Sequence, residues 1–468
     1  MDSRPLVIGL CDALVRTDLL IETCFAEVGR QPTRMAKFFR AALGGKASFK
    51  SHVQDTAEID PANLPYDPAV IELIKSARAE GRPVYLASGS NGRLVERVAE
   101  HLGLFDGWFA STDQTNLSGA DKAHQLVQAF GEGGYDYVGA KGSDLPAWNS
   151  AAKAVVLRKS KWLGHIEASE VEHLDGERPT WRAWAKLLRV HQYAKNVLVF
   201  APLLASHVFT IPALSQAILA FIAFSLCASS VYILNDLVDL REDRGHRSKR
   251  TRPLASGVIP LTHGAIAAPL LLAASMLMAL AVSVPFAAVL LGYFALTTAY
   301  SFGLKRMLLI DVIALAGLYT VRVLGGAVAV GVGVSEWLLG FCLMLFLSLA
   351  LIKRYVELAA RRDADLADPT SRDYKLGDLE LVGALAAATG LNSVTIFALY
   401  ISSDSVNQLY ARPEILWLVA PLLFYWISRA LVLACRRQMN DDPVVFALRD
   451  RASLVTVALA ALLVVVAI

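Results

Sequence analysis

The sequence has little cysteine, only five residues in 468, and they are scattered along the chain. No two of them form a CxxC pair, which argues against both a zinc site and a disulfide framework. Charge of either sign is not in excess, because 45 Lys and Arg and 42 Asp and Glu leave a formal net charge of +3. There is no low-complexity segment, and nothing indicates a nucleic-acid partner. The oligomeric state stays open, a homo-oligomer included.

The N-terminus also lacks the apolar core that follows a basic start in a signal peptide, so we expect the first domain to stay in the cytosol. Hydropathy then divides the chain. Residues 1–190 mix charged and apolar positions, whereas from Asn196 onward apolar runs alternate with short charged loops. We predict an α/β domain over 1–165, a linker with an interfacial helix over 166–188, and a polytopic all-α membrane domain over 189–468.

The membrane half contains nine apolar segments, several near the ~20 residues that span a bilayer. They cover 196–210, 213–235, 262–282, 285–302, 309–330, 336–353, 379–402, 414–435 and 452–468. If all nine cross, the loops at 236–261, 303–308, 354–378 and 436–451 return to the cytosol. These loops carry almost all the Lys and Arg of this half. The asymmetry follows the positive-inside rule and predicts a multi-pass protein of the cytoplasmic membrane.

A polar motif follows the second apolar segment: NDLVDLRED at 235–243. Asn235, Asp236, Asp239 and Asp243 form an oxygen-rich face where a membrane helix ends, and carboxylates near membrane depth are usually functional. A basic run that includes Arg244, Lys249 and Arg252 comes next. Carboxylates that bind Mg²⁺ beside cations that bind phosphate suit a diphosphate leaving group. The alternative is a solvated loop, which the basic residues alone would also fit.

Further polar residues stand at the cytosolic ends of other segments. We expect them to ring one cavity that opens to the cytosol, with Asp311 joining the metal ligands. Phosphate would be bound by Lys195, Lys305, Arg322, Lys353 and Arg354, with Asn196, Tyr300 and Glu357 as further substrate contacts. Lys305 and the Asp residues are the candidate catalytic groups.

Several of these residues also have structural interpretations. Lys305 could be a snorkelling anchor, and Lys353 with Glu357 could be an i,i+4 helix pair. Tyr300 could belong to an aromatic belt at the membrane interface. Arg322 lies deep in an apolar helix, where an unpaired cation is costly, which favours a function.

Three motifs resemble the UbiA-type superfamily of intramembrane prenyltransferases: the Asp-rich motif, KRTRPLASG at 249–257, and YS…K…D at 300–311. The resemblance covers residues 185–468. The resemblance implies nine helices around a cavity, in which two Asp-rich sites hold a Mg²⁺-bound diphosphate. Most members transfer a prenyl group to an aromatic or other acceptor. In many of them the second site reads DxxxD, whereas Leu315 stands here at the fifth position.

Four stretches resemble one branch, the decaprenyl-phosphate phosphoribosyltransferases: QYAKNVLV at 192–199, YSFGLK at 300–305, KRYVEL at 353–358 and DDPVVF at 441–446. In that branch phosphoribosyl diphosphate is the donor and a polyprenyl phosphate is the acceptor. An anionic acceptor needs no strong general base, and the sequence offers no obvious base within the membrane. The alternatives are a prenyltransferase with an aromatic acceptor and a non-enzymatic transporter or scaffold.

In the N-terminal domain, buried strands are predicted at 6–10, 84–88, 135–138 and 154–157, with helices at 69–80 and 92–102 between them. This alternation indicates a parallel, doubly wound sheet. The order resembles the haloacid-dehalogenase (HAD) phosphatases. Ser88, Lys122 and Asp144 match that family's motifs, whereas Gly9, Cys11 and Ala140 stand where it has carboxylates. Without a carboxylate nucleophile we expect a HAD-like scaffold that lacks phosphatase activity.

Overall fold

The computed structural model describes residues 4–30, 59–112, 116–157, 163–175, 179–333, 335–369, 372–439 and 443–468. The chain forms two compact units. The first comprises Met1–Val190 and Tyr232–Pro269, and the second comprises His191–Val231 and Leu270–Ile468. The division passes through helices α10 (Ile211–Val238) and α12 (Leu261–Val282).

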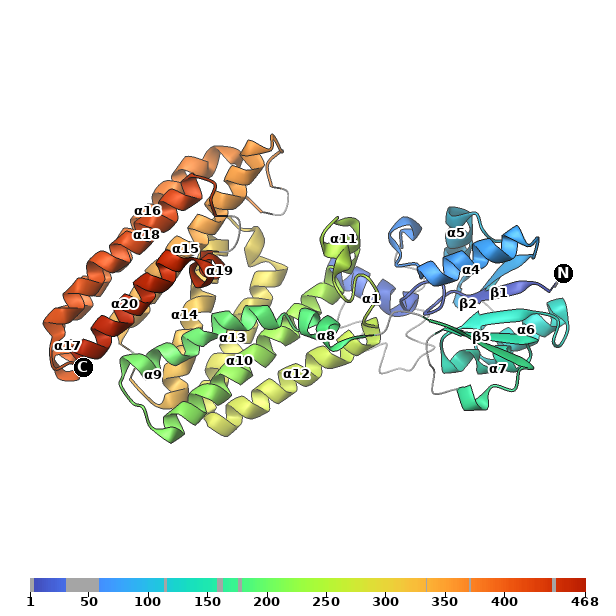
Figure 1. Cartoon of the computed structure of the whole chain (residues 1–468), viewed down its shortest axis with the longest axis horizontal. Helices are drawn as coiled ribbons and strands as arrows, with labels where there is room; N and C mark the ends of the chain where they lie inside the picture. The colour runs from blue at the N-terminus through green and yellow to red at the C-terminus, as the bar shows by residue number, and fades with distance from the viewer. Residues whose placement is uncertain are drawn as a thin grey trace. The chain divides into compact units, whose positions relative to one another are not determined.

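The first unit contains a six-stranded sheet with the order β3-β2-β1-β4-β5-β6, and the pairing is parallel throughout (Figure 1). The strands are β1 (Leu6–Gly9), β2 (Val84–Asn91), β3 (Gly107–Ser111), β4 (Asp136–Gly139), β5 (Lys153–Leu157) and β6 (Glu170–Leu174). Four of them confirm the predicted buried strands, and the doubly wound α/β class is confirmed.

Helices cover both faces of this sheet. Leu6 and Ile8 of β1 pack with α4 (Pro68–Ala79) and α5 (Gly92–Leu102). Val7, which points to the opposite face, packs with α6 (Ala120–Phe130) and α7 (Leu145–Asn149). Helix α4 begins one residue before the expected position because Asp67 caps it: its side chain accepts a hydrogen bond from the backbone N–H of Ala69.

Strand β6 lies in the stretch that the sequence analysis assigned to a linker. It pairs with β5 as an edge strand, and Lys153 forms ion pairs with Glu170 and Glu172. The sequence EVEHL has no continuous apolar run, because an edge strand is only partly buried. The linker continues into helix α8 (Trp181–Leu187), whose N-cap is Thr180. Helices α1 (Leu19–Arg30) and α11 (Leu240–Gly245) complete the first unit.

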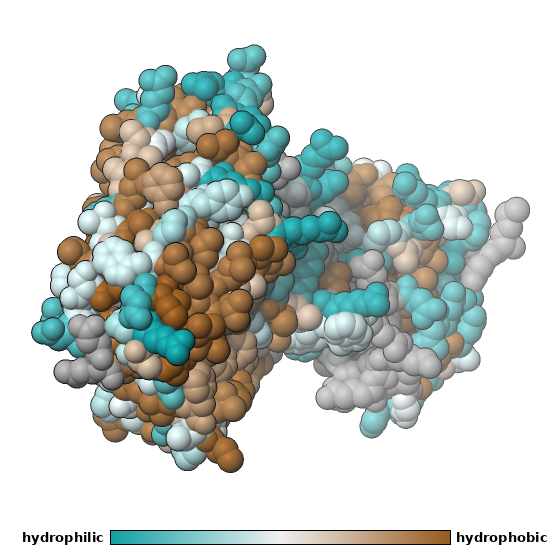
Figure 2. Space-filling model, turned by 60° about the vertical axis from the view of Figure 1, so that its left-hand side comes forward, coloured by the Kyte–Doolittle hydropathy of each residue, from teal (hydrophilic) through white to brown (hydrophobic). Residues whose placement is uncertain are grey.

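The second unit is helical. Besides parts of α10 and α12, it contains α9 (Ala201–Ala205), α13 (Val284–Phe302), α14 (Ile310–Val330), α15 (Glu336–Asp363), α16 (Leu379–Ile401), α17 (Asp404–Leu409), α18 (Val419–Cys435), α19 (Pro443–Arg449) and α20 (Arg451–Ala467). Helix α14 packs against α13 and α15, α15 against α16, and α18 against α16 and α20. Large apolar side chains such as Leu270, Leu277 and Leu381 are exposed on the outer helices, and Figure 2 shows a largely apolar surface there.

Within the described residues, seven helices are long and apolar enough to cross a membrane, and α20 is a shorter apolar helix. The expected count of nine is therefore not confirmed. The first predicted segment, 196–210, forms the end of a 3-10 helix (Val190–Phe200) and the short helix α9. The 3-10 helix packs closely on α14, since a Cβ on Gly326 would lie 2.0 Å from the carbonyl oxygen of Val199.

Candidate functional site

The Asp-rich motif occupies the end of α10 and the helix α11. The first helix ends at Val238, and Asp239 stands at the N-cap position of the second, so the chain turns between Asp236 and Asp243. Both of these carboxylates are buried, with 4% and 1% of the residue exposed. They converge on one cation, because Nη1 of Arg252 donates to Asp236 at 3.0 Å and to Asp243 at 2.6 Å.

More cations of the first unit surround these two carboxylates. Nη2 of Arg189 lies 2.5 Å from Asp236, and Nζ of Lys249 lies 4.0 Å from Asp243. Burial raises the pKa of Asp243, and the charge of Arg252 opposes this shift. These basic side chains thus hold the two carboxylates close together, and the same cations could bind the oxygens of a phosphate-bearing ligand.

The described residues contain no group of three or more His, Cys, Asp or Glu side chains arranged to hold a metal. Asp239 is half-buried, and Asn235 lies in the last turn of α10. Two convergent carboxylates still fit Mg²⁺, which usually binds one or two carboxylates and completes its shell with waters and substrate phosphates. The position of Arg252 Nη1 shows that a cation can sit between Asp236 and Asp243.

Asp311 lies in the first turn of helix α14 in the second unit and is fully buried. Its two carboxylate oxygens have different partners: Nε of Arg354 donates to one and the hydroxyl of Tyr374 to the other, both at 2.6 Å. Arg354 also contacts Glu357 at 2.5 Å. Burial, together with Asp311, raises the pKa of Tyr374, so this phenol stays a proton donor. The structure therefore brings Asp311, Arg354 and Glu357 together, as an ion-pair network.

Arg322 lies further along α14 and is also buried. It donates to the side-chain oxygen of Asn196 at 2.8 Å, to the hydroxyl of Tyr293 at 2.9 Å and to the carbonyl of Leu318 at 2.6 Å. Its guanidinium also lies over the rings of Tyr293 and Tyr319. The predicted residues Asn196 and Arg322 are thus in direct contact, and every described acceptor of Arg322 is neutral.

The remaining predicted residues of the second unit lie on the 3-10 helix Val190–Phe200, at and just after the end of α13, and within α15. Lys195 lies over the ring of Tyr319 at 5.8 Å, and Lys305 is half-buried in a short turn after α13. The hydroxyl of Tyr300 lies 3.4 Å from Nη2 of Arg354, and Lys353 precedes that arginine. Asp441 and Asp442, which carry part of the branch resemblance, lie outside the described residues.

In the HAD-like domain, the space beside Gly9 is filled. A Cβ at this position would lie 3.1 Å from the carbonyl oxygen of Val138 and 3.2 Å from the hydroxyl of Tyr137. That hydroxyl accepts from Lys122 at 2.7 Å and donates to Asp144 at 3.0 Å. Lys122 also contacts Asp144 at 2.5 Å. Two residues that match phosphatase motifs are therefore bonded to each other and to a tyrosine.

Burial and neighbouring charges shift the pKa values of two groups near Gly9, Asp144 and Cys11. Burial alone would raise the pKa of Asp144, but Lys122 and two backbone N–H groups bring it below its usual value. Desolvation, and then Asp18, raises the pKa of the Cys11 thiol, so the reactive thiolate is disfavoured. The hydroxyl of Ser88 accepts from the backbone N–H of Ser90 at 3.0 Å, and Ala140 offers only its backbone N–H, to Asp144.

Sequence reasoning missed Tyr374 and the buried glutamate of α1, Glu22, as partners of the predicted residues. Tyr374 stands in a charged loop, and Glu22 lies in the HAD-like domain. Each reaches its partner only through tertiary packing, so no local pattern identified it. Arg244, predicted to bind substrate, is 7% exposed and forms an ion pair with Glu22.

Comparison with known proteins identifies the relatives of both parts. Residues 197–454 match the UbiA prenyltransferase family, and residues 9–147 match the haloacid dehalogenase-like hydrolases. The uncharacterized protein y4nM of Sinorhizobium fredii is 35% identical over 457 residues, which cover 96% of this chain and 88% of that protein. Nodulation protein NoeC of Azorhizobium caulinodans is 34% identical, covering 58% of this chain and 89% of NoeC.

Decaprenyl-phosphate phosphoribosyltransferase of Mycobacterium tuberculosis is 35% identical over 210 residues, which cover 43% of this chain and 69% of that enzyme. The apolar helices and the family match together identify a multi-pass integral membrane protein with a HAD-like N-terminal domain. The chain belongs to the UbiA prenyltransferase family.

Proposed function

We propose that this protein transfers the 5-phosphoribosyl group from phosphoribosyl diphosphate to a polyprenyl phosphate and releases diphosphate. The observation that carries the proposal is the convergence of two buried carboxylates, Asp236 and Asp243, on one cation position among basic side chains. The choice of donor and acceptor is supported by the named mycobacterial relative and by the motif at 353–358.

Asp236 and Asp243 would hold Mg²⁺, with Asp239 and Asn235 as further oxygen ligands. The ion would supply positive charge to the oxygens of the leaving diphosphate. Arg252, Arg189 and Lys249 already face these carboxylates, and their cations would bind diphosphate oxygens when the carboxylates turn to the metal. The role of Asp311 as a second metal ligand stays a prediction.

The reaction breaks the C–O bond to diphosphate and forms a C–O bond to the acceptor phosphate. Positive charge develops on the carbon and negative charge on the leaving group, and fixed cations offset the latter. The acceptor is an anion at neutral pH, so its oxygen attacks without prior loss of a proton. Lys195, Lys305, Arg322 and Lys353 are the proposed contacts for the two anionic substrates.

We further propose that the HAD-like domain is not a phosphatase. A phosphoaspartate intermediate requires a carboxylate nucleophile. Gly9 has no carboxylate, and a Cβ there would already make contacts of 3.1 and 3.2 Å. Lys122 and Asp144 neutralise each other, so the lysine charge that would attract a phosphate is balanced.

Topology completes the proposal. We place the N-terminal domain and the basic loops on the cytosolic side of the cytoplasmic membrane, because Lys and Arg concentrate in alternate loops. Labelling of single cysteines with a membrane-impermeant thiol reagent, in a background without the five native cysteines, tests this. Labelling of a cysteine at exposed Arg250 in intact cells would contradict it.

The transfer assay uses the full chain in detergent with Mg²⁺, radiolabelled phosphoribosyl diphosphate and a polyprenyl phosphate. We expect label in the organic phase after solvent extraction, and we expect EDTA to abolish it. A parallel reaction offers a prenyl diphosphate and a phenolic acceptor. Prenyl transfer there, without phosphoribosyl transfer, would assign this chain to the prenyltransferases that use aromatic acceptors.

A further inference from the structure

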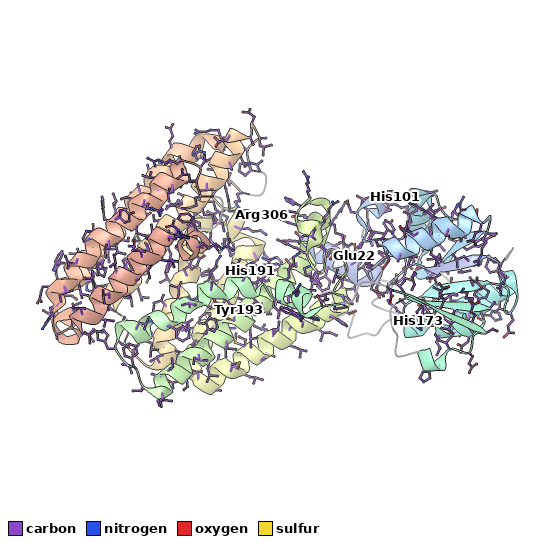
Figure 3. All side chains as sticks on the ribbon, in the orientation of Figure 1. Glu22, His101, His173, His191, Tyr193 and Arg306 are labelled. Carbon is purple, nitrogen blue, oxygen red and sulfur yellow. The ribbon has the colours of Figure 1, made fainter. Side chains whose placement is uncertain are left out.

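The HAD-like domain contacts the Asp-rich motif through a buried ion pair inside the first unit. Glu22 stands on α1 (Figure 3), and its Oε1 accepts from Nη1 of Arg244 on α11. The two residues are 222 positions apart in sequence, and only 8% and 7% of them are exposed. Arg244 is fixed on its other side as well, because its Nε donates to the carbonyl of Ala255 at 2.9 Å.

This pair is costly to maintain. Removing two charges from water is unfavourable, and here Oε2 of Glu22 and Nη2 of Arg244 have no hydrogen-bond partner among the described residues. Burial raises the pKa of Glu22, and the neighbouring Arg244 is the main group that opposes the shift. Breaking one side of such a pair leaves an uncompensated buried charge, so each residue holds the other in place.

A second contact joins the same two segments. Gly257 has a φ of +71°, and a Cβ there would lie 2.5 Å from both Cβ and the carbonyl oxygen of Arg16. The turn before Gly257 carries Ala255, the acceptor for Arg244. A pocket lined by Ile59, Leu240 and the ion pair extends the contact. The HAD-like domain therefore touches both the helix of the Asp-rich motif and the turn that follows it.

Asp243 lies beside this contact. It immediately precedes Arg244 in α11, a helix of six residues whose own hydrogen bonds cannot hold it in one place. We propose that Glu22 is a positioning residue: by fixing Arg244 it fixes α11 and, with it, the Asp243 carboxylate. The degenerate domain would then act as a support for the transferase site. This inference rests on the proposed function, and it changes the expected role of Arg244 from substrate contact to support.

Two measurements on the full chain in detergent test this. Limited trypsin digestion reports how firmly the motif is held, because Arg241, Arg247, Lys249 and Arg250 are exposed cleavage sites. Mass spectrometry of the products gives the initial cleavage rate at these bonds. Steady-state transfer kinetics then report KM separately for phosphoribosyl diphosphate and for polyprenyl phosphate.

The variants are Glu22→Leu, Arg244→Met and the double variant, with Glu72→Leu on exposed α4 as the matched control. Each single variant leaves one charge buried, so we expect cleavage to accelerate about tenfold. The double variant removes both charges, and we expect its cleavage rate to return to within about threefold of wild type. In Glu22→Leu, KM for phosphoribosyl diphosphate should rise about tenfold while KM for the polyprenyl phosphate stays unchanged.

Three results overturn the inference: cleavage of Glu22→Leu at the rate of the control, additive effects of the two single changes on cleavage, or an equal rise of both KM values. The last would indicate general loosening rather than positioning. If the wild-type chain transfers no phosphoribosyl group, the proposed function fails, whereas a non-additive proteolysis result would still establish the support of α11 by Glu22.

Discussion

The filled space beside Gly9 predicts that the phosphatase nucleophile cannot be restored by substitution. In Gly9→Asp, the new Cβ would lie 3.1 Å from the carbonyl oxygen of Val138 and 3.2 Å from the hydroxyl of Tyr137. Both distances are shorter than ordinary van der Waals contacts, and the carboxyl group would extend further into the same space. We therefore expect a destabilised domain without phosphatase activity, rather than a revived enzyme.

The magnitude follows from two effects. Forcing a methyl-sized group into a packed site costs about 1–3 kcal/mol. The added carboxylate would also be buried close to Asp144, a like charge already matched by Lys122, so the total for Gly9→Asp should reach about 3 kcal/mol or more. Gly9→Ala, which adds only the Cβ, should cost about 1–3 kcal/mol.

Hydrogen exchange measured by mass spectrometry on the full chain gives the local opening free energy of β1 and β4 without unfolding the membrane helices. Tyr137→Phe serves as the partner variant, because it removes the hydroxyl that Gly9→Ala would meet. We expect the double variant to be more stable than the sum of the single effects by about 1 kcal/mol. Hydrolysis of p-nitrophenyl phosphate with Mg²⁺ measures phosphatase activity in each variant.

Two outcomes would refute this reasoning. One is Gly9→Ala with wild-type protection of β1 and β4, because the site would then have room that the geometry denies. The other is measurable Mg²⁺-dependent turnover by Gly9→Asp, because Tyr137 would then not obstruct a nucleophile. Turnover by the wild-type chain would contradict the inactive assignment itself.

The remaining predictions concern charge. Asp239→Asn and Asp243→Asn should each lower phosphoribosyl transfer at least about 100-fold with the protein still in the membrane fraction, and near-normal activity in both would exclude the metal role. Because the pKa of Asp144 is lower in the native state than in the unfolded state, its ionised form stabilises the native state at any pH above the unfolded-state value. In the wild type, protection of the β4 amides from hydrogen exchange should therefore fall only as the pH drops below about 4. In Lys122→Met, burial outweighs the two remaining backbone N–H bonds and raises the pKa of Asp144 above its unfolded value. The sign then reverses, so hydrogen-exchange protection of β4 should increase from pH 7 to pH 5; the same pH profile as wild type would contradict this. Arg322→Met should raise KM for an anionic substrate about tenfold. Unchanged KM values for both substrates would show that Arg322 has only a structural role.

Much of the fold could be predicted from the sequence because its signals are local. Buried strands such as Leu6–Gly9 are continuous apolar runs, and long apolar helices such as α14 stand out by length. The failures have physical causes. Strand β6 alternates charge at an exposed sheet edge, and residues 196–210 are apolar because they pack against α14, although the helices they form are too short to span a bilayer.

The candidate site was less predictable than the fold. The sequence identified the groups that converge, such as Asp243 and Arg252, because they lie nine residues apart around one turn. It could not identify Glu22 as the partner of Arg244, because nothing local relates residues 222 positions apart. Nor could a matching motif reveal that Lys122 is bonded to Tyr137, which only the packing of β4 determines.

Charge balance separates the buried arginines into two kinds. Arg244 and Arg354 each form an ion pair with a buried carboxylate, so the protein itself balances their positive charge without a bound ligand. Arg322 donates only to neutral groups among its described contacts, and its positive charge stays unbalanced inside an apolar helix. Such a cation is costly in a membrane unless an anion offsets it. The substrates proposed for this protein are both phosphate anions, and Arg322 is the buried arginine whose environment a bound phosphate would improve.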